Sequence, residues 1–504
     1  MSDPEQTVDP LVAPPSTLAG ADDVVYNPSL ERLREFSRDL ETTTEFGSPA
    51  YVSDQRSRSA DRTKNAVDDD FDDEDDAYVE AAFERARTSE MVCVDRRMGR
   101  HPDHSYTCRL FVPKRYGRIA LAWAKLFEPA EGDSRPDFLT IQLPDWDERA
   151  IRVLPEEGVT VVLGSDYTGE AKKSFLRLFM FHAKRAGGLG LHAGSKRVTL
   201  RTEDGDLEDV GQLFLGLSAT GKSTLTAHGL WLDDPEEATM LQDDVCALLP
   251  DGTVAGSEGQ GLYVKTIGLD ANEQPTLHAA VTHESAVLEN VDVAPDGTVD
   301  FDSDRHTSNG RAVVQRSCLD SAGPDIDLER VDQIFFITRN PTMPPVAKLS
   351  PEEAAAAFML GESIQTSAGD PSAAGESIRV VGTNPFIVGS EGEEGNRFRD
   401  LIADLGVDCF VLNTGYLGER SKDIGVADTV TLLRGIARGS VDWRADDVSG
   451  LTVPDAVPGM DVDEFDVATH VERYEEALRD LRSERRAYLA GFDDLNDDIR
   501  DAVY

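Results

Sequence analysis

The stretch "GQLFLGLSATGKSTLTAHGL", residues 211–230, carries the strongest signal in the chain. At its centre a glycine is followed by four residues and then by Gly-Lys-Ser, the spacing of a phosphate-binding loop (P-loop). Small residues let successive backbone N–H groups curl around phosphate oxygens, and the following helix adds its positive N-terminal end. The apolar run before the loop predicts a strand, and "STLTAHGLWL" predicts the start of a helix. The stretch therefore predicts a phosphate site between a strand and a helix.

The loop and an aspartate pair downstream of it form the first group of candidate site residues. The loop residues expected to bind a nucleotide are Gly216, Leu217, Ser218, Ala219, Thr220, Gly221, Lys222 and Ser223. Lys222 would reach the outer phosphates, and the Ser223 hydroxyl would ligate a divalent cation. Asp243 and Asp244 interrupt an apolar strand predicted over residues 238–249. Carboxylates at the end of a neighbouring strand would meet the cation that the loop holds.

The remaining patterns predict a mixed α/β fold. Further strands are expected at 158–164, 333–340 and 408–415, and helices at 115–127 and 173–188. Apolar residues between Val467 and Tyr488 recur at helical spacing, which predicts one long amphipathic helix packed against the core. The composition of residues 363–377 is typical of a flexible loop.

The net charge of the chain indicates which kinds of macromolecule it can bind. The 504 residues include 95 acidic and 50 basic ones, a formal net charge of −45, and only 11 of the basic residues are lysines. Such a surface repels nucleic acid and anionic membranes, so neither is expected as a partner. Acid spread along the chain with scarce lysine predicts a protein adapted to high salt (halophilic), where ions screen the self-repulsion. The dense acidic run at residues 68–76 is expected to be solvated and mobile.

Cysteine usage and the N-terminal sequence predict a cytoplasmic protein. The five cysteines are widely spaced and show no Cys-x-x-Cys pair, which argues for a reducing compartment and against a zinc site. No stretch resembles a signal peptide or a membrane span. The expected domains are a disordered leader at 1–22, an N-terminal substrate-binding domain at 23–205, and a C-terminal nucleotide-binding domain at 206–504.

Several motifs together resemble one known family. They are "DYTGEAKKS" (166–174), "GLGLHAGSK" (188–196), the P-loop, "QDD", "AVLENV" and "TSNGR", in this order. This set is similar to ATP-dependent phosphoenolpyruvate carboxykinase, and weaker similarity extends over residues 24–490. The resemblance implies an α/β (mixed α+β), two-lobed fold with a P-loop nucleotide-binding C-terminal domain. It also implies a gluconeogenic enzyme, a monomer, that converts oxaloacetate and ATP into phosphoenolpyruvate, ADP and CO2.

The resemblance also implies roles for individual residues. Lys173, His192 and Asp244 would hold Mn²⁺ (or Mg²⁺), while Ser223 and Asp243 would serve Mg²⁺–ATP. A lysine ligates a metal only when deprotonated, and the positive charge of Lys172 favours that form. The other implied residues are Lys222 and Arg311 at the transferred phosphoryl group, Arg58 and Tyr167 at the substrate, and Glu289, Lys265 and Thr429 near the nucleotide. Because the decarboxylation itself produces the enolate, the chemistry needs no general base, only positive charge beside the developing oxyanion.

The chain departs from the family pattern at several places, among them the following three. In "RSRSADRTK" (56–64) the substrate-binding arginine is either Arg58 or Arg56. The mobile lid of the family is replaced by "LGESIQTSAG" (360–369). The late arginine that contacts the nucleotide is replaced by Asp423, with Lys422 and Arg420 as alternatives. Two other functions remain open at this point: a different P-loop kinase, of a small molecule or a protein, and a non-catalytic nucleotide-binding relative.

Overall fold

The computed structural model describes residues 10–18, 23–56, 59–202, 204–217, 220–272, 274–364, 377–419 and 421–504. The chain divides into two compact units, residues 1–181 with 257–320 and residues 182–256 with 321–504. It crosses from one unit to the other within helix α5 (Thr168–Arg185). The predicted division into domains at residue 206 stays a prediction. Of the predicted leader, residues 1–9 and 19–22 lie outside the described residues.

The first unit contains a large mixed sheet and a smaller one. The large sheet has the order β1 (Val24–Tyr26), β5 (Met91–His101), β6 (His104–Pro113), β8 (Phe138–Leu143), β10 (Val159–Leu163), β9 (Ala150–Leu154) and β4 (Thr63–Asn65), with β7 (Glu128–Pro129) beside β5. The smaller sheet has the order β17 (Gly261–Lys265), β21 (Arg311–Gln315), β18 (Val287–Glu289), β3 (Pro49–Tyr51) and β2 (Thr42–Thr43). The helices of this unit are α1 (Pro15–Leu18), α2 (Leu30–Phe36), α3 (Asp73–Thr88), α4 (Gly117–Ala124), α7 (Pro275–Val281) and most of α5.

The second unit is built around one eight-stranded sheet. Its order is β14 (Glu237–Gln242), β12 (Ala193–Arg201), β13 (Leu207–Gly216), β22 (Gln333–Thr338), β26 (Asp408–Asn413), β23 (Val346–Leu349), β30 (Thr452–Ala456) and β29 (Asp442–Ala445). A small sheet holds β11 (Leu189–Leu191), β15 (Cys246–Leu248) and β16 (Val254–Gly256), and two hairpins hold β24 (Glu362–Ile364) with β25 (Ser377–Arg379) and β27 (Tyr416–Leu417) with β28 (Lys422–Asp423). The helices are α6 (Lys222–Ala227), α8 (Pro351–Leu360), α9 (Glu391–Leu405), α10 (Val426–Ala437), α11 (Val467–His470), α12 (Tyr474–Leu489) and α13 (Asp497–Asp501).

Helices cover both faces of the central strand β22, which is why its sequence "QIFFIT" is apolar throughout. Ile334 and Phe336 belong to one hydrophobic cluster with residues of α8 and α9. Phe335 and Ile337 belong to another cluster with residues of α10. Successive side chains of a strand point to opposite faces, so the continuous apolar run fills two cores.

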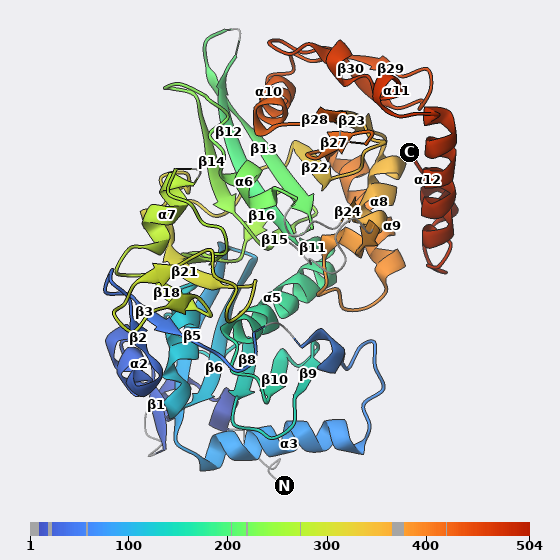
Figure 1. Ribbon diagram of the computed structural model, residues 1–504. Helices are drawn as coiled ribbons and strands as arrows, with labels where there is room; N and C mark the ends of the chain where they lie inside the picture. The colour runs from blue at the N-terminus through green and yellow to red at the C-terminus, as the bar shows by residue number, and fades with distance from the viewer. Residues whose placement is uncertain are drawn as a thin grey trace. The chain divides into compact units, whose positions relative to one another are not determined.

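The strand directions gather several loops at one edge of this sheet, which we call the carboxyl edge. β13, β22 and β26 are parallel, and β12 is antiparallel to both β13 and β14. The carboxyl ends of β14, β13, β22 and β26 therefore lie at the same edge, together with the amino end of β12. The long β12–β13 hairpin and α6 beyond it are drawn in green in Figure 1.

Most elements predicted from the sequence are present. The strands predicted at 158–164, 333–340 and 408–415 are confirmed as β10, β22 and β26, and the helices at 115–127 and 173–188 as α4 and α5. The predicted strand at 238–249 is split into β14 and β15, with the two aspartates between them. The stretch 363–377 lies mostly outside the described residues.

The prediction of one long C-terminal helix is wrong. The segment forms α11 and α12, separated at Val471–Arg473, and Arg473 adopts a left-handed backbone conformation with φ 51°. Neither proline nor glycine marks this break, so periodicity alone did not reveal it. The expected packing is confirmed, because Tyr474, Leu478 and Leu489 are buried in hydrophobic clusters.

The acidic run at 68–76 is also more ordered than expected. Asp72 caps α3 by accepting hydrogen bonds from the backbone N–H groups of residues 74 and 75. Asp75 is 1 % exposed and pairs with Lys64 (2.7 Å) and Arg152 (2.5 Å). These partners lower the pKa of Asp75 to about 2, against the effect of burial, which alone would raise it. One member of the run is therefore a structural carboxylate, which a count of charges does not show.

Candidate active site

The predicted P-loop follows β13 at the carboxyl edge, as its sequence indicates. Gly216 ends β13 and α6 begins at Lys222, while residues 218 and 219 lie outside the described residues. Gly221 has φ 101°, a conformation that residues with a Cβ rarely adopt, so a glycine is required here. A Cβ on Gly216 would lie 2.6 Å from the Thr220 hydroxyl oxygen, so the first loop glycine is also fixed by close packing.

The end of β26 holds the loop in place. The Thr414 hydroxyl donates a hydrogen bond to the carbonyl oxygen of Thr220 (2.7 Å), and the Thr414 N–H donates to the carbonyl oxygen of Thr338 (3.0 Å). The Thr220 hydroxyl donates to the carbonyl oxygen of Leu217 (2.8 Å). The loop is therefore tied to two strands that do not precede it, which limits its motion.

Two charged side chains near the loop each have a buried atom without a hydrogen-bond partner among the described residues. The ammonium nitrogen of Lys222 and one carboxylate oxygen of Asp243 are buried, and neither has a hydrogen-bond partner among the residues that the structure describes. Buried polar atoms are nearly always hydrogen-bonded in proteins, so such exceptions call for a missing ligand. A phosphate oxygen would satisfy Lys222, and a divalent cation would satisfy Asp243.

His192 and Asp244 form a contact that suits a metal ion. Nδ1 of His192 lies 2.6 Å from the carbonyl oxygen of Thr383, and Nε2 lies 3.0 Å from Oδ1 of Asp244. A carbonyl only accepts, so Nδ1 carries a proton, and in the neutral ring Nε2 then presents a lone pair to the carboxylate. Fixing the far nitrogen in this way is how proteins orient a metal-binding imidazole. The pair fits a divalent transition metal such as Mn²⁺.

The predicted third ligand, Lys173, belongs to the other unit. It lies half-buried on α5, next to the buried Lys172. Its meeting with His192 and Asp244 stays a prediction. Within the described part of the chain, no group of three or more His, Cys, Asp or Glu side chains is placed to hold a metal. The predicted ligand set contains a lysine with only one histidine and one carboxylate, so the absence of such a group does not bear on it.

The first unit gathers a second set of predicted residues around Tyr263. Arg311 lies opposite Lys265 in β17 and opposite Glu289 in β18. The Tyr263 hydroxyl donates a short hydrogen bond to Glu289, and the Arg311 guanidinium lies 5.5 Å from the centre of the Tyr263 ring. Burial and the nearby Arg311 charge lower the pKa of Lys265. Strand register therefore brings Lys265, Glu289 and Arg311 together, while their roles at the nucleotide and the phosphoryl group stay predictions.

Lys172 and Tyr167 join the same cluster. Lys172 and Glu258 are both about 1 % exposed, and their charged atoms lie 3.0 Å apart. The ammonium group of Lys172 also lies 5.5 Å from the centre of the Tyr263 ring. The buried Tyr167 receives a hydrogen bond of 3.3 Å on its hydroxyl oxygen from the side-chain amide of Asn309. Lys172 is therefore held by a buried ion pair.

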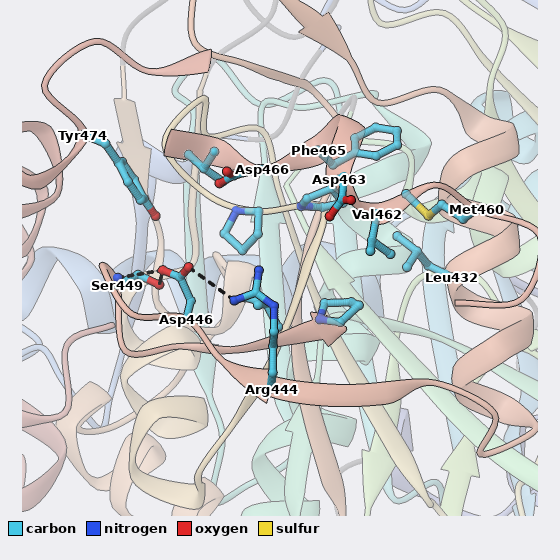
Figure 2. A pocket seen from close by; sticks show the side chains of 15 residues that line it. Leu432, Arg444, Asp446, Ser449, Met460, Val462, Asp463, Phe465, Asp466 and Tyr474 are labelled. Atoms are coloured by element: carbon cyan, nitrogen blue, oxygen red, sulfur yellow. Dashed lines mark hydrogen bonds and ion pairs between the residues drawn. The ribbon is translucent and has the colours of Figure 1, made fainter. Parts of the chain in front are cut away.

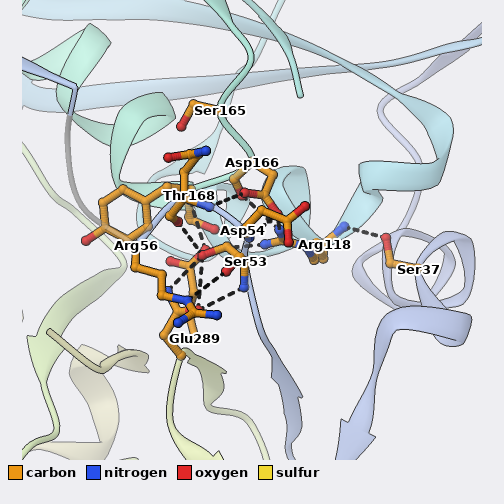
Figure 3. A network of polar contacts seen from close by, with 12 residues as sticks. Ser37, Ser53, Asp54, Arg56, Arg118, Ser165, Asp166, Thr168 and Glu289 are labelled. Atoms are coloured by element: carbon orange, nitrogen blue, oxygen red, sulfur yellow. Dashed lines mark hydrogen bonds and ion pairs between the residues drawn. The ribbon is translucent and has the colours of Figure 1, made fainter. Parts of the chain in front are cut away.

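A polar network anchors the segment before the predicted substrate arginine (Figure 3). Arg118 donates to a carboxylate oxygen of Asp166 (2.6 Å) and lies 3.3 Å from Glu289. Asp166 accepts hydrogen bonds from the backbone N–H groups of Asp54 (3.0 Å) and Gln55 (2.9 Å). The carboxylate thereby fixes the backbone just before residue 56.

Not every predicted residue is placed by this geometry. Arg58, Ser218, Ala219 and Arg420 lie outside the described residues. Arg56, the alternative to Arg58, donates to the carbonyl oxygen of His306 (2.7 Å). The remaining predicted residues in the second unit are Leu217, which is half-buried, Ser223, which is exposed, and Thr429, which is buried and donates to the carbonyl oxygen of Gly425 (3.0 Å).

Sequence reasoning missed Glu258, Arg118, Asp166 and Tyr263. Glu258 and Tyr263 stand in the stretch "SEGQGLYVK" (257–265), where an acid near an aromatic residue was the available signal. Arg118 gave no local signal, because its importance comes from burial with partners far away in the sequence.

The second unit also has a hollow outside the predicted site (Figure 2). Its lining includes Arg444, Asp446, Phe465 and Tyr474. Asp446 accepts hydrogen bonds from the N–H (2.7 Å) and hydroxyl (2.6 Å) of Ser449. None of the predicted site residues lines this hollow.

The sheets covered by helices and the gathered polar groups define the class: a mixed α/β enzyme. A family model described as phosphoenolpyruvate carboxykinase matches residues 42–463. The chain is 36 % identical over 475 residues to the phosphoenolpyruvate carboxykinase (ATP) of Aeropyrum pernix, covering 93 % of this chain and 94 % of that protein. It is 31 % identical over 370 residues to the enzyme of the same name from Mesorhizobium japonicum, covering 68 % of this chain and 66 % of that protein. The chain belongs to the phosphoenolpyruvate carboxykinase (ATP) family.

This membership confirms the family, fold class, function and enzyme class predicted from the sequence. The family's reaction is ATP-dependent and its role is gluconeogenic. Its substrates are oxaloacetate or phosphoenolpyruvate with ATP or ADP, and it requires a divalent metal and Mg²⁺–ATP. No helix among the described residues is long and apolar enough to cross a membrane.

Proposed function

We propose that the carboxyl edge of the second unit is the nucleotide site of the carboxykinase reaction. The observation that carries this proposal is the buried ammonium group of Lys222, which has no hydrogen-bond partner among the described residues. Backbone N–H groups of the loop from Gly216 to Ser223 hold the phosphates of ATP, and Lys222 neutralises the outer ones. Ser223 and Asp243 hold the Mg²⁺ that accompanies ATP, and Glu289 and Thr429 support the site.

The reaction divides into two bond changes. The carbon–carbon bond to the departing carboxylate of oxaloacetate breaks, CO2 leaves, and the electron pair stays as an enolate. The enolate oxygen then attacks the γ-phosphorus of ATP, and the bond to the β-phosphate oxygen breaks to release ADP. Arg311 and Lys222 supply positive charge to the transferred phosphoryl group. Arg58 grips a substrate carboxylate, Tyr167 contacts the substrate, and Lys172 sets the charge around Lys173.

His192 and Asp244 would hold the metal, with Lys173 as their third partner. The lone pair of His192 Nε2 and the carboxylate of Asp244 support this assignment, because they face each other at 3.0 Å. The metal, when bound, supplies positive charge that favours the electron-rich enolate over oxaloacetate. We take Mn²⁺ as the preferred ion, because imidazole, amine and carboxylate ligands suit a transition metal.

The experiment is oxaloacetate-dependent release of ADP by the full chain, measured with ATP and with GTP, with Mn²⁺ and with Mg²⁺. We expect turnover with ATP and Mn²⁺ and the loss of nearly all of it after Lys222→Met. ATP hydrolysis without oxaloacetate dependence would instead favour another P-loop kinase. Turnover that survives Lys222→Met would contradict the nucleotide site, and a chain that never turns over would favour a non-catalytic relative.

Charge supports proposals about the setting of the enzyme. The net charge of −45 favours a cytoplasmic, halophilic monomer without nucleic-acid or membrane partners. Activity and sedimentation across KCl concentrations test this. We expect activity to rise with KCl and the sedimenting species to have the mass of one chain. Full activity and stability in dilute buffer would contradict the adaptation to salt.

A further inference from the structure

Arg339 directly follows β22 at the carboxyl edge of the second unit. The strand lies between β13, which leads into the P-loop, and β26. Its register pairs Ile337 with Gly216, the first loop residue, on one side and with Leu412 on the other. Two residues beyond Ile337, Arg339 emerges beside the loop, because neighbouring strands are only about 4.8 Å apart.

The surroundings of Arg339 belong to the loop's support. A Cβ placed on Gly415 would lie 3.3 Å from the Cα and Cβ atoms of Arg339, so the ends of β22 and β26 are in close contact. Thr414, the residue before Gly415, is the one whose hydroxyl holds the carbonyl oxygen of Thr220 in the loop. The backbone of Arg339 therefore packs against the same strand end, that of β26, which holds the P-loop by a hydrogen bond.

The guanidinium of Arg339 lacks an anion. Its Nε is buried without a hydrogen-bond partner, and no ion pair is found for it in the part of the chain that the structure describes. Burial lowers the pKa of Arg339, and no neighbouring acid offsets that effect. Arg339 as a whole is partly buried, so the cost falls on the enclosed Nε, which has no hydrogen-bond partner among the described residues. An enclosed guanidinium N–H without a partner is costly, and a bound anion would satisfy it.

We propose that Arg339 binds the phosphate chain of ATP, next to Lys222. A guanidinium offers paired N–H donors that match phosphate oxygens, and the P-loop beside it is where those oxygens lie. In this chain Arg339 takes the place of the family's late nucleotide-contacting arginine, which is Asp423 here. Asp423 is exposed, and Lys422 beside it is paired with Glu464 (2.5 Å). This inference rests on the proposed nucleotide site.

The test compares Arg339→Gln with Arg330→Gln in the full chain. Arg330 precedes the amino end of the same strand, is exposed, and pairs with Asp332 (2.6 Å), so it is a matched control. Binding of Mg²⁺–ATP, ADP and adenosine is measured by titration calorimetry without oxaloacetate. We expect Arg339→Gln to weaken ATP binding about 10- to 100-fold, the loss typical of a charged hydrogen-bond partner, and to leave adenosine binding unchanged. Arg330→Gln should change neither.

Thermal unfolding without ligand keeps the result interpretable. Arg339→Gln should melt at the same temperature as the unaltered chain or above it, because it removes an unpaired buried charge. Arg339→Lys should retain part of the ATP affinity, which a purely structural role does not predict. Unchanged ATP binding in Arg339→Gln, or a loss confined to phosphoenolpyruvate, would overturn the inference. If Lys222→Met also leaves ATP binding unchanged, the nucleotide site itself is wrong; if only Lys222→Met weakens it, the site stands and Arg339 has no part in it.

Discussion

Two regions of the second unit treat buried positive charge in opposite ways. Behind the sheet, Arg485 is 1 % exposed and donates to the Glu362 carboxylate (2.8 Å), which also accepts from Arg379 (2.9 Å). At the carboxyl edge, Lys222 and Arg339 have buried nitrogens without hydrogen-bond partners among the described residues. In the first region the fold supplies the counter-charge. In the second, the proposed counter-charge comes with the substrate.

The paired interior around Glu362 and the carboxyl edge meet at two consecutive residues, Arg339 and Asn340. Asn340 donates its side-chain amide to Glu362 (3.0 Å) and so belongs to the paired interior, whereas Arg339 does not. Neighbouring residues of an extended chain point to opposite faces, which lets a single strand end serve both regions. Burial of a charged side chain therefore does not by itself indicate a binding site. The indicator is a buried charged group that has no hydrogen-bond or ion-pair partner among the described residues.

The largest expected effect is on catalysis, from Lys222→Met. Loss of a cation that neutralises the transferred phosphoryl group should lower kcat about 10⁴-fold, or about 5 kcal/mol of transition-state stabilisation. Because the ammonium nitrogen has no hydrogen-bond partner in the described part of the chain, the free energy of unfolding should hardly change. Steady-state kinetics and denaturant titration in high KCl measure the two quantities. A strong loss of stability without ligand would place Lys222 with the paired interior instead.

The next effect is on stability, from Glu362→Leu. This change leaves Arg485 buried without its carboxylate, which costs about 3–5 kcal/mol, measured by denaturant titration. The arginines hold the pKa of Glu362 at about 2, although burial alone would raise it. A lowered carboxyl pKa stabilises the fold above pH 4.5, and this contribution is lost as the pH falls towards 2.

Two variants control the Glu362 experiment. Glu464→Gln removes the acid of an exposed pair with Lys422 and should change the free energy of unfolding far less than Glu362→Leu does, because water screens an exposed pair. The double variant Glu362→Leu/Arg485→Met should recover part of the lost stability, because it removes the buried Arg485 charge together with its acid, while Arg379 keeps its contact with Glu484 (3.5 Å). Equal losses from the exposed and the buried acid would refute the distinction between the two regions.

The sequence predicted more of the carboxyl edge than of the interior. The P-loop spacing, the aspartate pair and the histidine motif located Lys222, Asp243 and the His192–Asp244 contact, because each motif is local and chemically specific. Arg339 gave no such signal in the sequence. It stands out only because its buried Nε has no hydrogen-bond partner among the described residues, and the tertiary fold decides which partners a side chain meets.

The same limit explains the two corrections to the fold. The buried Asp75 stands among acids that look alike in the sequence, and only its contacts with Lys64 and Arg152 set it apart. The break before α12 falls at Arg473, which adopts a left-handed conformation although its residue type does not favour one. Local patterns therefore predict elements and motifs, whereas partners and breaks depend on the assembled chain.

A smaller effect concerns pH and the buried Lys196. Its ammonium nitrogen donates to the carbonyl oxygens of Leu225, in α6, and of His228 (2.7 Å), which caps that helix, and burial lowers its pKa to about 7. Between pH 7 and 10.5 the unfolded chain then binds a proton that the folded chain does not, so stability rises with pH. From pH 7 to 9 the rise should be about 2 kcal/mol larger in the unaltered chain than in Lys196→Met, measured by denaturant titration. Parallel pH profiles would show that Lys196 is charged in the fold.

The smallest effect separates Lys422 from Arg339. Lys422 is one of the sequence-based alternatives for the missing nucleotide arginine, but it pairs with Glu464 (2.5 Å) and lies 4.4 Å from the centre of the Phe465 ring. An ammonium group already engaged in this way gains little from a phosphate, so Lys422→Met should change the Kd for Mg²⁺–ATP less than about threefold. Titration calorimetry of Lys422→Met beside Arg339→Gln, under identical KCl, measures the difference directly. The contrary outcome is a tenfold weaker binding of ATP in Lys422→Met and unchanged binding in Arg339→Gln. Lys422, which is paired with Glu464, would then contact the nucleotide, and the absence of a hydrogen-bond partner for a buried nitrogen would not identify the nucleotide site.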